Sequence, residues 1–264
     1  MKKSQTRLDL ATDFLRKQQL EAAEIEAKKA LEFHSGNAEA HYILGLVDYF
    51  RSRSAHQLLE IDQCLTGVDA EVLLKEKARF LEQAETHLEE ACKRNPELGE
   101  AWATRGVTAT LRGRHTEAIS HLETALGHPA RLQNIALVRA NLGWAYFHRN
   151  DMASATKELL QAAQFQPGMC VATYRLGRVY FARKEWEKAL QKFREVTGPL
   201  GCPLQDAHLY MMKTYLELGV DAELAEAESA CVGMAPKSCV ALQCGALSRP
   251  EVSTRPIDEV STAR

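Results

Sequence analysis

A sequence pattern that recurs every 34 residues constrains the fold of this chain more than any other feature. The stretch LGWAYFHRNDMASA begins at Leu142, and the related stretch LGRVYFARKEWEKA begins 34 residues later, at Leu176. Self-similarity at a fixed period of a few tens of residues is the signature of repeat architectures, in which each unit packs mainly on its neighbours. The pattern therefore predicts a stack of similar units rather than one undivided core.

Small and apolar residues recur at matching positions of the two units. In the unit that begins at Ala136, positions 7, 8, 11, 20, 24, 27 and 32 hold Leu142, Gly143, Tyr146, Ala155, Leu159, Ala162 and Pro167. This is the tetratricopeptide pattern, a helix–turn–helix unit in which small residues let the two helices approach closely. The unit from Cys170 repeats it, and weaker copies begin at Ser4, Gly99 and Gln205.

The repeat predicts the fold class and the domain limits. We expect an all-α, right-handed superhelical solenoid of about six helix–turn–helix repeats, closed by a C-terminal capping helix. The solenoid is expected to form a single domain over residues 4–247. Residues 248–264 contain two prolines, little apolar content and no period, which predicts a disordered tail.

The second repeat contains a 27-residue insertion, within residues 51–83. Its sequence predicts a lengthened first helix, a short turn at Thr66 and Gly67, and an extended second helix. Two interpretations stay open: loop growth that the fold tolerates, and a protrusion that contacts a specific partner.

Composition and motifs exclude several classes of function. The formal charge of −2 and the absence of a basic run argue against nucleic-acid binding. The chain contains no HExxH, GxSxG, Walker or GxGxxG motif, and no zinc-finger spacing, so we expect no enzyme, no cofactor and no metal. No apolar run is long enough to span a bilayer, and polar residues follow Lys2 and Lys3 where a signal peptide would be apolar.

Apolar residues occupy the first-helix positions that line the concave groove of tetratricopeptide proteins. The candidate partner-binding residues are Tyr42, Leu46, Tyr49, Phe50, Val107, Leu111, Trp144, Phe147, Tyr174, Arg178 and Phe181. Contiguous exposed apolar area usually marks a binding site, so we predict that the groove holds an apolar segment of a protein partner. The alternative is that a tightly wound superhelix, or the insertion, covers these side chains.

A carboxylate clamp, another known use of such grooves, is incomplete in this sequence. Asn141 and Arg175 occupy position 6 of successive units, as a clamp would allow. However, Ala103, Val107 and Val171 stand where a clamp has Lys or Asn. The sequence therefore does not favour capture of a chaperone's C-terminal carboxylate.

The repeats from Gln5 to about Pro236 resemble a multi-repeat tetratricopeptide protein. Within that class, RLDLATDFLRKQQLEAAEIEAKKALE and the stretch from ALVRANLGWAYF to EWEKALQKF look like type IV pilus pilotins of the PilF, PilW and Tgl type. The resemblance implies a non-enzymatic lipoprotein at the periplasmic face of the outer membrane, which promotes multimerisation of the secretin channel. The signal peptide and lipidated cysteine of that family are not present in this sequence. The alternative is a cytosolic scaffold or co-chaperone that binds soluble partner peptides.

This resemblance also bears on the seven cysteines, five of which lie in the last 95 residues. A periplasmic location favours disulfides. Cys170 and Cys202 stand at or just before the predicted first helices of adjacent units, which can come within disulfide distance. We predict that these two are bonded; pairing of Cys202 with Cys239, or buried thiols without bonds, are the alternatives.

Overall fold

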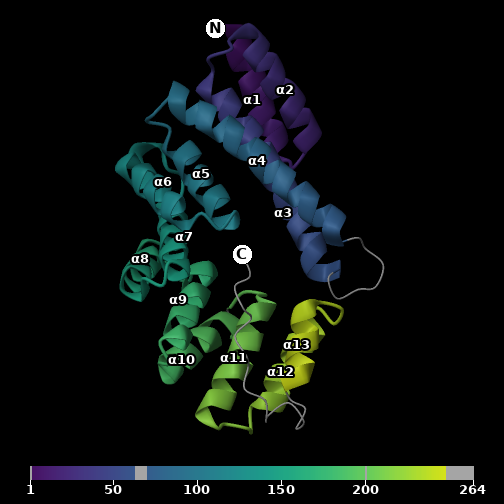
Figure 1. Cartoon of the computed structure of the whole chain (residues 1–264), viewed down its shortest axis with the longest axis vertical. Helices are drawn as coiled ribbons and strands as arrows, with labels where there is room; N and C mark the ends of the chain where they lie inside the picture. The colour runs from purple at the N-terminus through teal and green to yellow at the C-terminus, as the bar shows by residue number, and fades with distance from the viewer. Residues whose placement is uncertain (1, 63–69, 200, 248–264) are drawn as a thin grey trace.

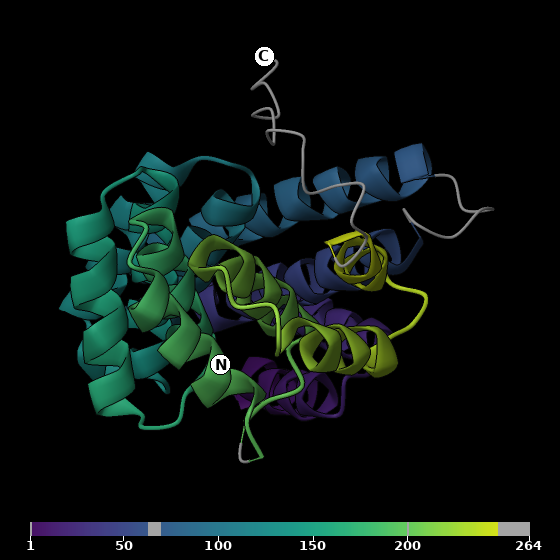
Figure 2. The same cartoon turned by 90° about the horizontal axis from the view of Figure 1, so that it is seen from below.

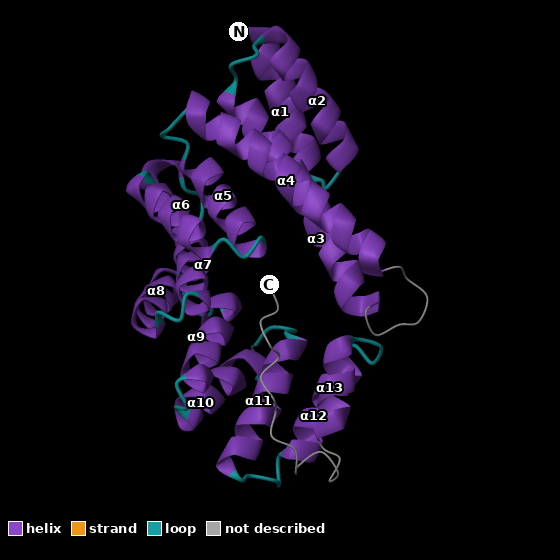
Figure 3. Ribbon diagram, viewed as in Figure 1, coloured by secondary structure: helices purple, strands orange, loops and turns teal. Residues whose placement is uncertain are grey.

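The chain folds into antiparallel helix pairs joined by short loops (Figures 1 and 3). The computed structural model describes residues 2–62, 70–199 and 201–247, and over these residues it contains thirteen α-helices, one short 3-10 helix and no strand. The helices are α1 (Lys2–Arg16), α2 (Leu20–Phe33), α3 (Ala38–Asp62), α4 (Ala70–Arg94), α5 (Gly99–Leu111), α6 (His115–Gly127), η1 (Pro129–Arg131), α7 (Ile135–His148), α8 (Met152–Phe165), α9 (Cys170–Ala182), α10 (Trp186–Thr197), α11 (Gln205–Leu218), α12 (Leu224–Met234) and α13 (Cys239–Leu247).

Each pair from α1–α2 to α11–α12 corresponds to one repeat, and α13 follows the last pair. The first helices α1, α3, α5, α7, α9 and α11 contact one another in series and form the inner layer of the superhelix. This arrangement places the predicted groove positions on one continuous inner surface.

Glycine at position 8 of a repeat allows the two helices of a pair to pack closely. A Cβ atom built on Gly143 would lie 2.7 Å from Leu159 Cγ, and one built on Gly177 would lie 2.6 Å from Phe193 Cε1. Leu159 and Phe193 are fully buried, each at 0% exposure. The second helix therefore fills the space that the glycine leaves, which explains why the sequence pairs a small residue with a large one in each unit.

The turn between the helices of a pair uses a left-handed residue at position 15. Gln18, Asn150 and Lys184 have φ between 57° and 60°, and Gly113 and Gly219 have φ of 74° and 66°. A left-handed residue just after a helix satisfies the last carbonyl groups and ends the helix. Three units thus adopt the left-handed conformation at a residue other than glycine, although a side chain makes this conformation strained.

Helices α3 and α4 contain 25 residues each, whereas the other paired helices contain 11 to 15. The predicted turn at Thr66 and Gly67 lies outside the described residues, as does the predicted tail over residues 248–264. Helices α13 and α3 are far apart in the sequence but contact each other (Figures 1 and 2). The last helix of the solenoid therefore packs against the second helix pair.

Disulfides join segments of the C-terminal half. Cys170 and Cys202 are bonded, with Cα atoms 6.1 Å apart, and this bond links the start of α9 to the loop before α11. The alternative pairing of Cys202 with Cys239 is therefore wrong. Cys231 of α12 and Cys244 of α13 form a second disulfide, with Cα atoms 6.4 Å apart, which holds the last helix to the preceding pair.

Candidate partner-binding groove

The eleven predicted groove residues lie on the inner helices α3, α5, α7 and α9. Ten of them are half-buried, Leu111 is exposed, and none is fully buried. The structure divides most of them between two regions, an apolar pocket and a cluster of aromatic and cationic side chains. Tyr49 of α3 and both Val107 and Leu111 of α5 belong to neither region, and Phe181 packs beside the second.

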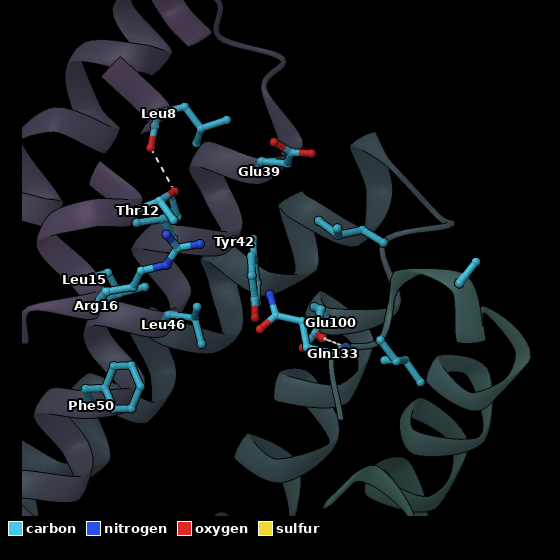
Figure 4. Close-up of a pocket in the computed structure, with 14 residues that line it drawn as sticks. Leu8, Thr12, Leu15, Arg16, Glu39, Tyr42, Leu46, Phe50, Glu100 and Gln133 are labelled. Carbon is cyan, nitrogen blue, oxygen red and sulfur yellow. Dashed lines mark hydrogen bonds between the residues drawn. The ribbon is translucent and has the colours of Figure 1, made fainter. Parts of the chain in front are cut away.

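The first region, called here the apolar pocket, is a cavity of about 620 Å³ between α1, α3, the start of α5 and the segment before α7 (Figure 4). Its lining is Leu8, Thr12, Leu15, Arg16, Glu39, Tyr42, Ile43, Leu46, Phe50, Leu98, Glu100, Ala130, Leu132 and Gln133. Three of the predicted residues, Tyr42, Leu46 and Phe50, form its α3 wall. The rest of the apolar lining was missed.

A repeat-based signal could have found the α1 wall. Counted from Ser4, the residues Leu8, Thr12, Leu15 and Arg16 occupy positions 5, 9, 12 and 13, which are the groove positions used for the other units. By contrast, Leu98 and Leu132 precede α5 and α7 in connecting segments. No periodic pattern identifies residues of such segments.

Polar groups lie along one side of the apolar pocket. In Figure 4, Tyr42 lies close to Glu100 and Gln133, and the Glu100 carboxylate accepts a hydrogen bond from the Gln133 backbone N–H. Burial raises the pKa of the Tyr42 phenol above its usual range, and the nearby Glu100 charge adds to the shift. Tyr42 is therefore a neutral phenol at physiological pH, and the pocket combines an apolar floor with a few orienting polar groups.

The second region, called here the Arg178 cluster, brings together Trp144, Phe147, Tyr174, Arg178 and Tyr210 from α7, α9 and α11. The rings of Trp144 and Phe147 stack with centroids 4.7 Å apart and planes at 6°. The guanidinium carbon of Arg178 lies 3.7 Å from the centre of the Tyr210 ring and 5.6 Å from that of Trp144. Its Nη1 donates a hydrogen bond of 3.0 Å to the Tyr174 hydroxyl.

Tyr210 was missed because it occupies position 6 of its unit, next to position 5, which is one of the groove positions. Phe181, which was predicted, packs against Tyr210 at a centroid distance of 5.4 Å and against Trp186 at 5.0 Å. Burial raises the pKa of Tyr174 to about 12. The aromatic groups of the cluster therefore present apolar faces and a neutral hydroxyl.

Arg175 of α9 lies beside this cluster and contacts α7. Arg175 donates hydrogen bonds of 2.9 Å to the Ala140 carbonyl and to Asn141 Oδ1, which hold α9 against α7. Burial lowers the pKa of Arg175 to about 10, and Tyr49 of α3 interacts electrostatically with it. Burial also raises the pKa of Tyr49. Tyr49 of α3 is therefore within electrostatic range of Arg175 on α9.

Within the described residues, no group of three or more His, Cys, Asp or Glu side chains is placed to hold a metal ion. In the same part of the chain, none of the helices has the length and apolar character needed to cross a membrane.

Comparison with known proteins identifies the architecture. A tetratricopeptide repeat family model matches residues 70–134. The solved structure of PilW, a widely conserved type IV pilus biogenesis factor, is similar with a TM-score of 0.72 and 17% identity, over 90% of this chain and 96% of PilW. PilF of Pseudomonas aeruginosa is similar with a TM-score of 0.67 and 15% identity, over 93% of this chain and 97% of PilF.

A third solved structure, the tetratricopeptide protein YrrB with its unusual peptide-binding site, matches with a TM-score of 0.52 and 18% identity, over 83% of this chain and 97% of YrrB. A search of curated protein sequences finds no match. The all-α tetratricopeptide fold is therefore confirmed, and the resemblance to PilW and PilF is confirmed at the level of the fold. Similarity to Tgl stays a prediction.

Proposed function

We propose that this chain is a non-enzymatic assembly factor that binds an apolar segment of an outer-membrane secretin subunit and promotes secretin multimerisation in type IV pilus biogenesis. The observation that carries the proposal is the apolar pocket on the inner wall of a solenoid with the PilW and PilF fold. Stacked helical repeats use such concave surfaces to bind other polypeptides.

The chemistry of the apolar pocket suits an apolar segment. Leu8 and Leu15 of α1 and Leu46 and Phe50 of α3 line a cavity of about 620 Å³, which has room for several aliphatic or aromatic side chains. Glu100 and Gln133 lie at its edge, where their polar groups can pair with the backbone of a bound segment. A segment that is apolar in the assembled secretin ring needs such cover before the ring forms.

The disulfides favour an oxidising compartment over the cytosol. Structural disulfides persist in the periplasm and are rare among cytosolic proteins. The bonds Cys170–Cys202 and Cys231–Cys244 therefore support a location at the periplasmic face of the outer membrane and weigh against the cytosolic scaffold.

Binding of the secretin subunit from the same organism tests the proposal. Leu46→Asp places a charge in the apolar pocket, and Leu160→Asp is the matched control, because Leu160 is 43% exposed on the outer helix α8. Burial of a leucine side chain contributes about 1.5–3 kcal/mol, so Leu46→Asp should weaken binding at least about tenfold. It should also reduce the yield of multimers, while the control binds normally.

Both variants must melt at the temperature of the wild type for this comparison to count. If Leu46→Asp is folded and binds the subunit as tightly as the wild type, the apolar pocket is not the binding site. If neither the wild type nor the control binds any secretin subunit, the proposed partner is wrong.

A further inference from the structure

We propose that the Arg178 cluster recognises a side-chain carboxylate, Asp or Glu, within the apolar segment that the groove binds. The inference rests on the proposed function, because it specifies a chemical feature of the same bound segment. Its evidence is the geometry and charge of α7, α9 and α11 rather than the apolar pocket.

Cationic side chains converge on the inner wall at this point. Trp144, Arg178 and Lys213 all occupy position 9 of consecutive units, so they form one row along the groove. Lys213 Nζ lies 4.8 Å from the centre of the Tyr210 ring, whose centre is 3.7 Å from the Arg178 guanidinium carbon. Two cations thus share one aromatic ring, and Arg175 lies one turn away on α9.

Within the described part of the chain, no carboxylate forms an ion pair with Arg175, Arg178 or Lys213. Arginines elsewhere on first helices do have such partners, as Arg139 has Glu158 at 2.6 Å. The Asp206 charge acts on Lys213, but burial and the Arg178 charge outweigh it and lower the Lys213 pKa. The inner wall therefore carries an excess of positive charge at this point.

Contact with an aromatic face stabilises a cation less than a charge-assisted hydrogen bond to a carboxylate does. The difference is larger when a bound segment has displaced water from the cation. The planar guanidinium of Arg178 suits a carboxylate, and Trp144 and Phe147 beside it provide apolar faces for the neighbouring residues of the same segment. An acidic residue between apolar residues therefore fits both the charge and the walls of the cluster. In a chain of net charge −2, this local excess is a feature of the groove and not of the whole surface.

Selection from a random 12-residue peptide library displayed on phage, with the full chain as bait, tests the proposal and requires no identified partner. Peptides that bind the wild type should contain Asp or Glu next to aliphatic or aromatic residues. A synthetic copy of the tightest peptide should lose at least tenfold in affinity when its acidic residue is replaced by the neutral amide.

Arg178→Gln should cause a similar loss, and the two changes together should cost little more than either alone, because both remove the same interaction. Arg183→Gln is the matched control: Arg183 follows the end of the same helix, its side chain is 41% exposed, and it pairs with Glu185. The control should leave the affinity unchanged. If Arg178→Gln weakened binding only by disturbing the fold, its loss would add to the loss from the neutral peptide. A combined loss smaller than the sum therefore shows that Arg178 contacts the acidic residue.

Three results would overturn the proposal. The first is a set of selected peptides that lack acidic residues and lose binding to the Leu46→Asp chain, which would mean that the groove binds a segment without reading a carboxylate. The second is full additivity of the two losses, which excludes a shared interaction. The third is loss of binding on amidation of the peptide's C-terminus, which would assign recognition to the terminal carboxylate. A library that yields no groove-dependent peptide would overturn the proposed function as well.

Discussion

Gly143→Ala tests whether close packing at position 8 of the repeat holds the helix pairs together. The added Cβ would lie 2.7 Å from Leu159 Cγ and 3.1 Å from the Ala155 carbonyl oxygen. Neither neighbour can move easily, since Leu159 is fully buried and the other contact is backbone. Overpacking of a core costs about 1–3 kcal/mol, and the better helix propensity of alanine returns about 1 kcal/mol. We therefore expect a net loss of up to about 2 kcal/mol in the free energy of unfolding.

Gly127→Ala is the control for helix propensity. No atom lies within 4 Å of a Cβ built on Gly127, so alanine there should leave stability unchanged or raise it by up to about 1 kcal/mol. Urea unfolding followed by circular dichroism measures both variants, with the midpoints compared at equal slope. A Gly143→Ala chain at least as stable as the wild type would refute the packing argument. A double variant with Leu159→Ala whose loss is smaller than the sum of the two single losses would support it, because alanine removes the Cγ atom that the added Cβ meets.

Three further predictions concern the disulfide, the pH dependence and the groove. Replacing Cys170 and Cys202 with serine should lower the free energy of unfolding by about 3–4 kcal/mol, since the bond closes a loop with a sequence separation of 32; an unchanged urea midpoint would contradict this. Burial lowers the pKa of His148 to about 4 from its usual 6.5, so the unfolded chain takes up this proton first, and stability should fall as the pH drops from about 6.5 to 4. His148→Gln should lose less stability over that range than the wild type in parallel melts. Trp144→Ser with Phe147→Ser should weaken partner binding at least about tenfold without unfolding the chain, and unchanged secretin assembly would count against the groove.

The helix pairs could be predicted from sequence because packing limits the residues at a few repeat positions. Gly143 and Leu159 are examples: the leucine side chain fills the space beside the glycine, so a small residue is needed at one position and a large one at the other. The left-handed turn residues are different: Gln18 and Lys184 adopt positive φ although their side chains disfavour it, so residue type gives little indication of that conformation.

The inner face of the groove was predictable from sequence, but contacts between distant repeats were not. Position within a repeat identifies which face of a first helix lines the concave surface of the superhelix, and this places Leu46 and Trp144 on the inner wall. The contact of α13 with α3 depends on the superhelical path and on an insertion without a period. The Cys231–Cys244 bond was missed for the same reason, because it depends on where the last helix packs.

Site-specific photo-crosslinking from the groove tests the central claim most directly. A photoreactive phenylalanine analogue at Leu46 faces the apolar pocket, and the same analogue at Leu160 faces outward from α8. In cells that assemble the pilus, we expect Leu46 to crosslink to the secretin subunit, through a peptide with apolar residues around an Asp or Glu, and Leu160 to give no such product. Crosslinking of the secretin from Leu160 alone, or equally from both positions, would contradict binding in the groove.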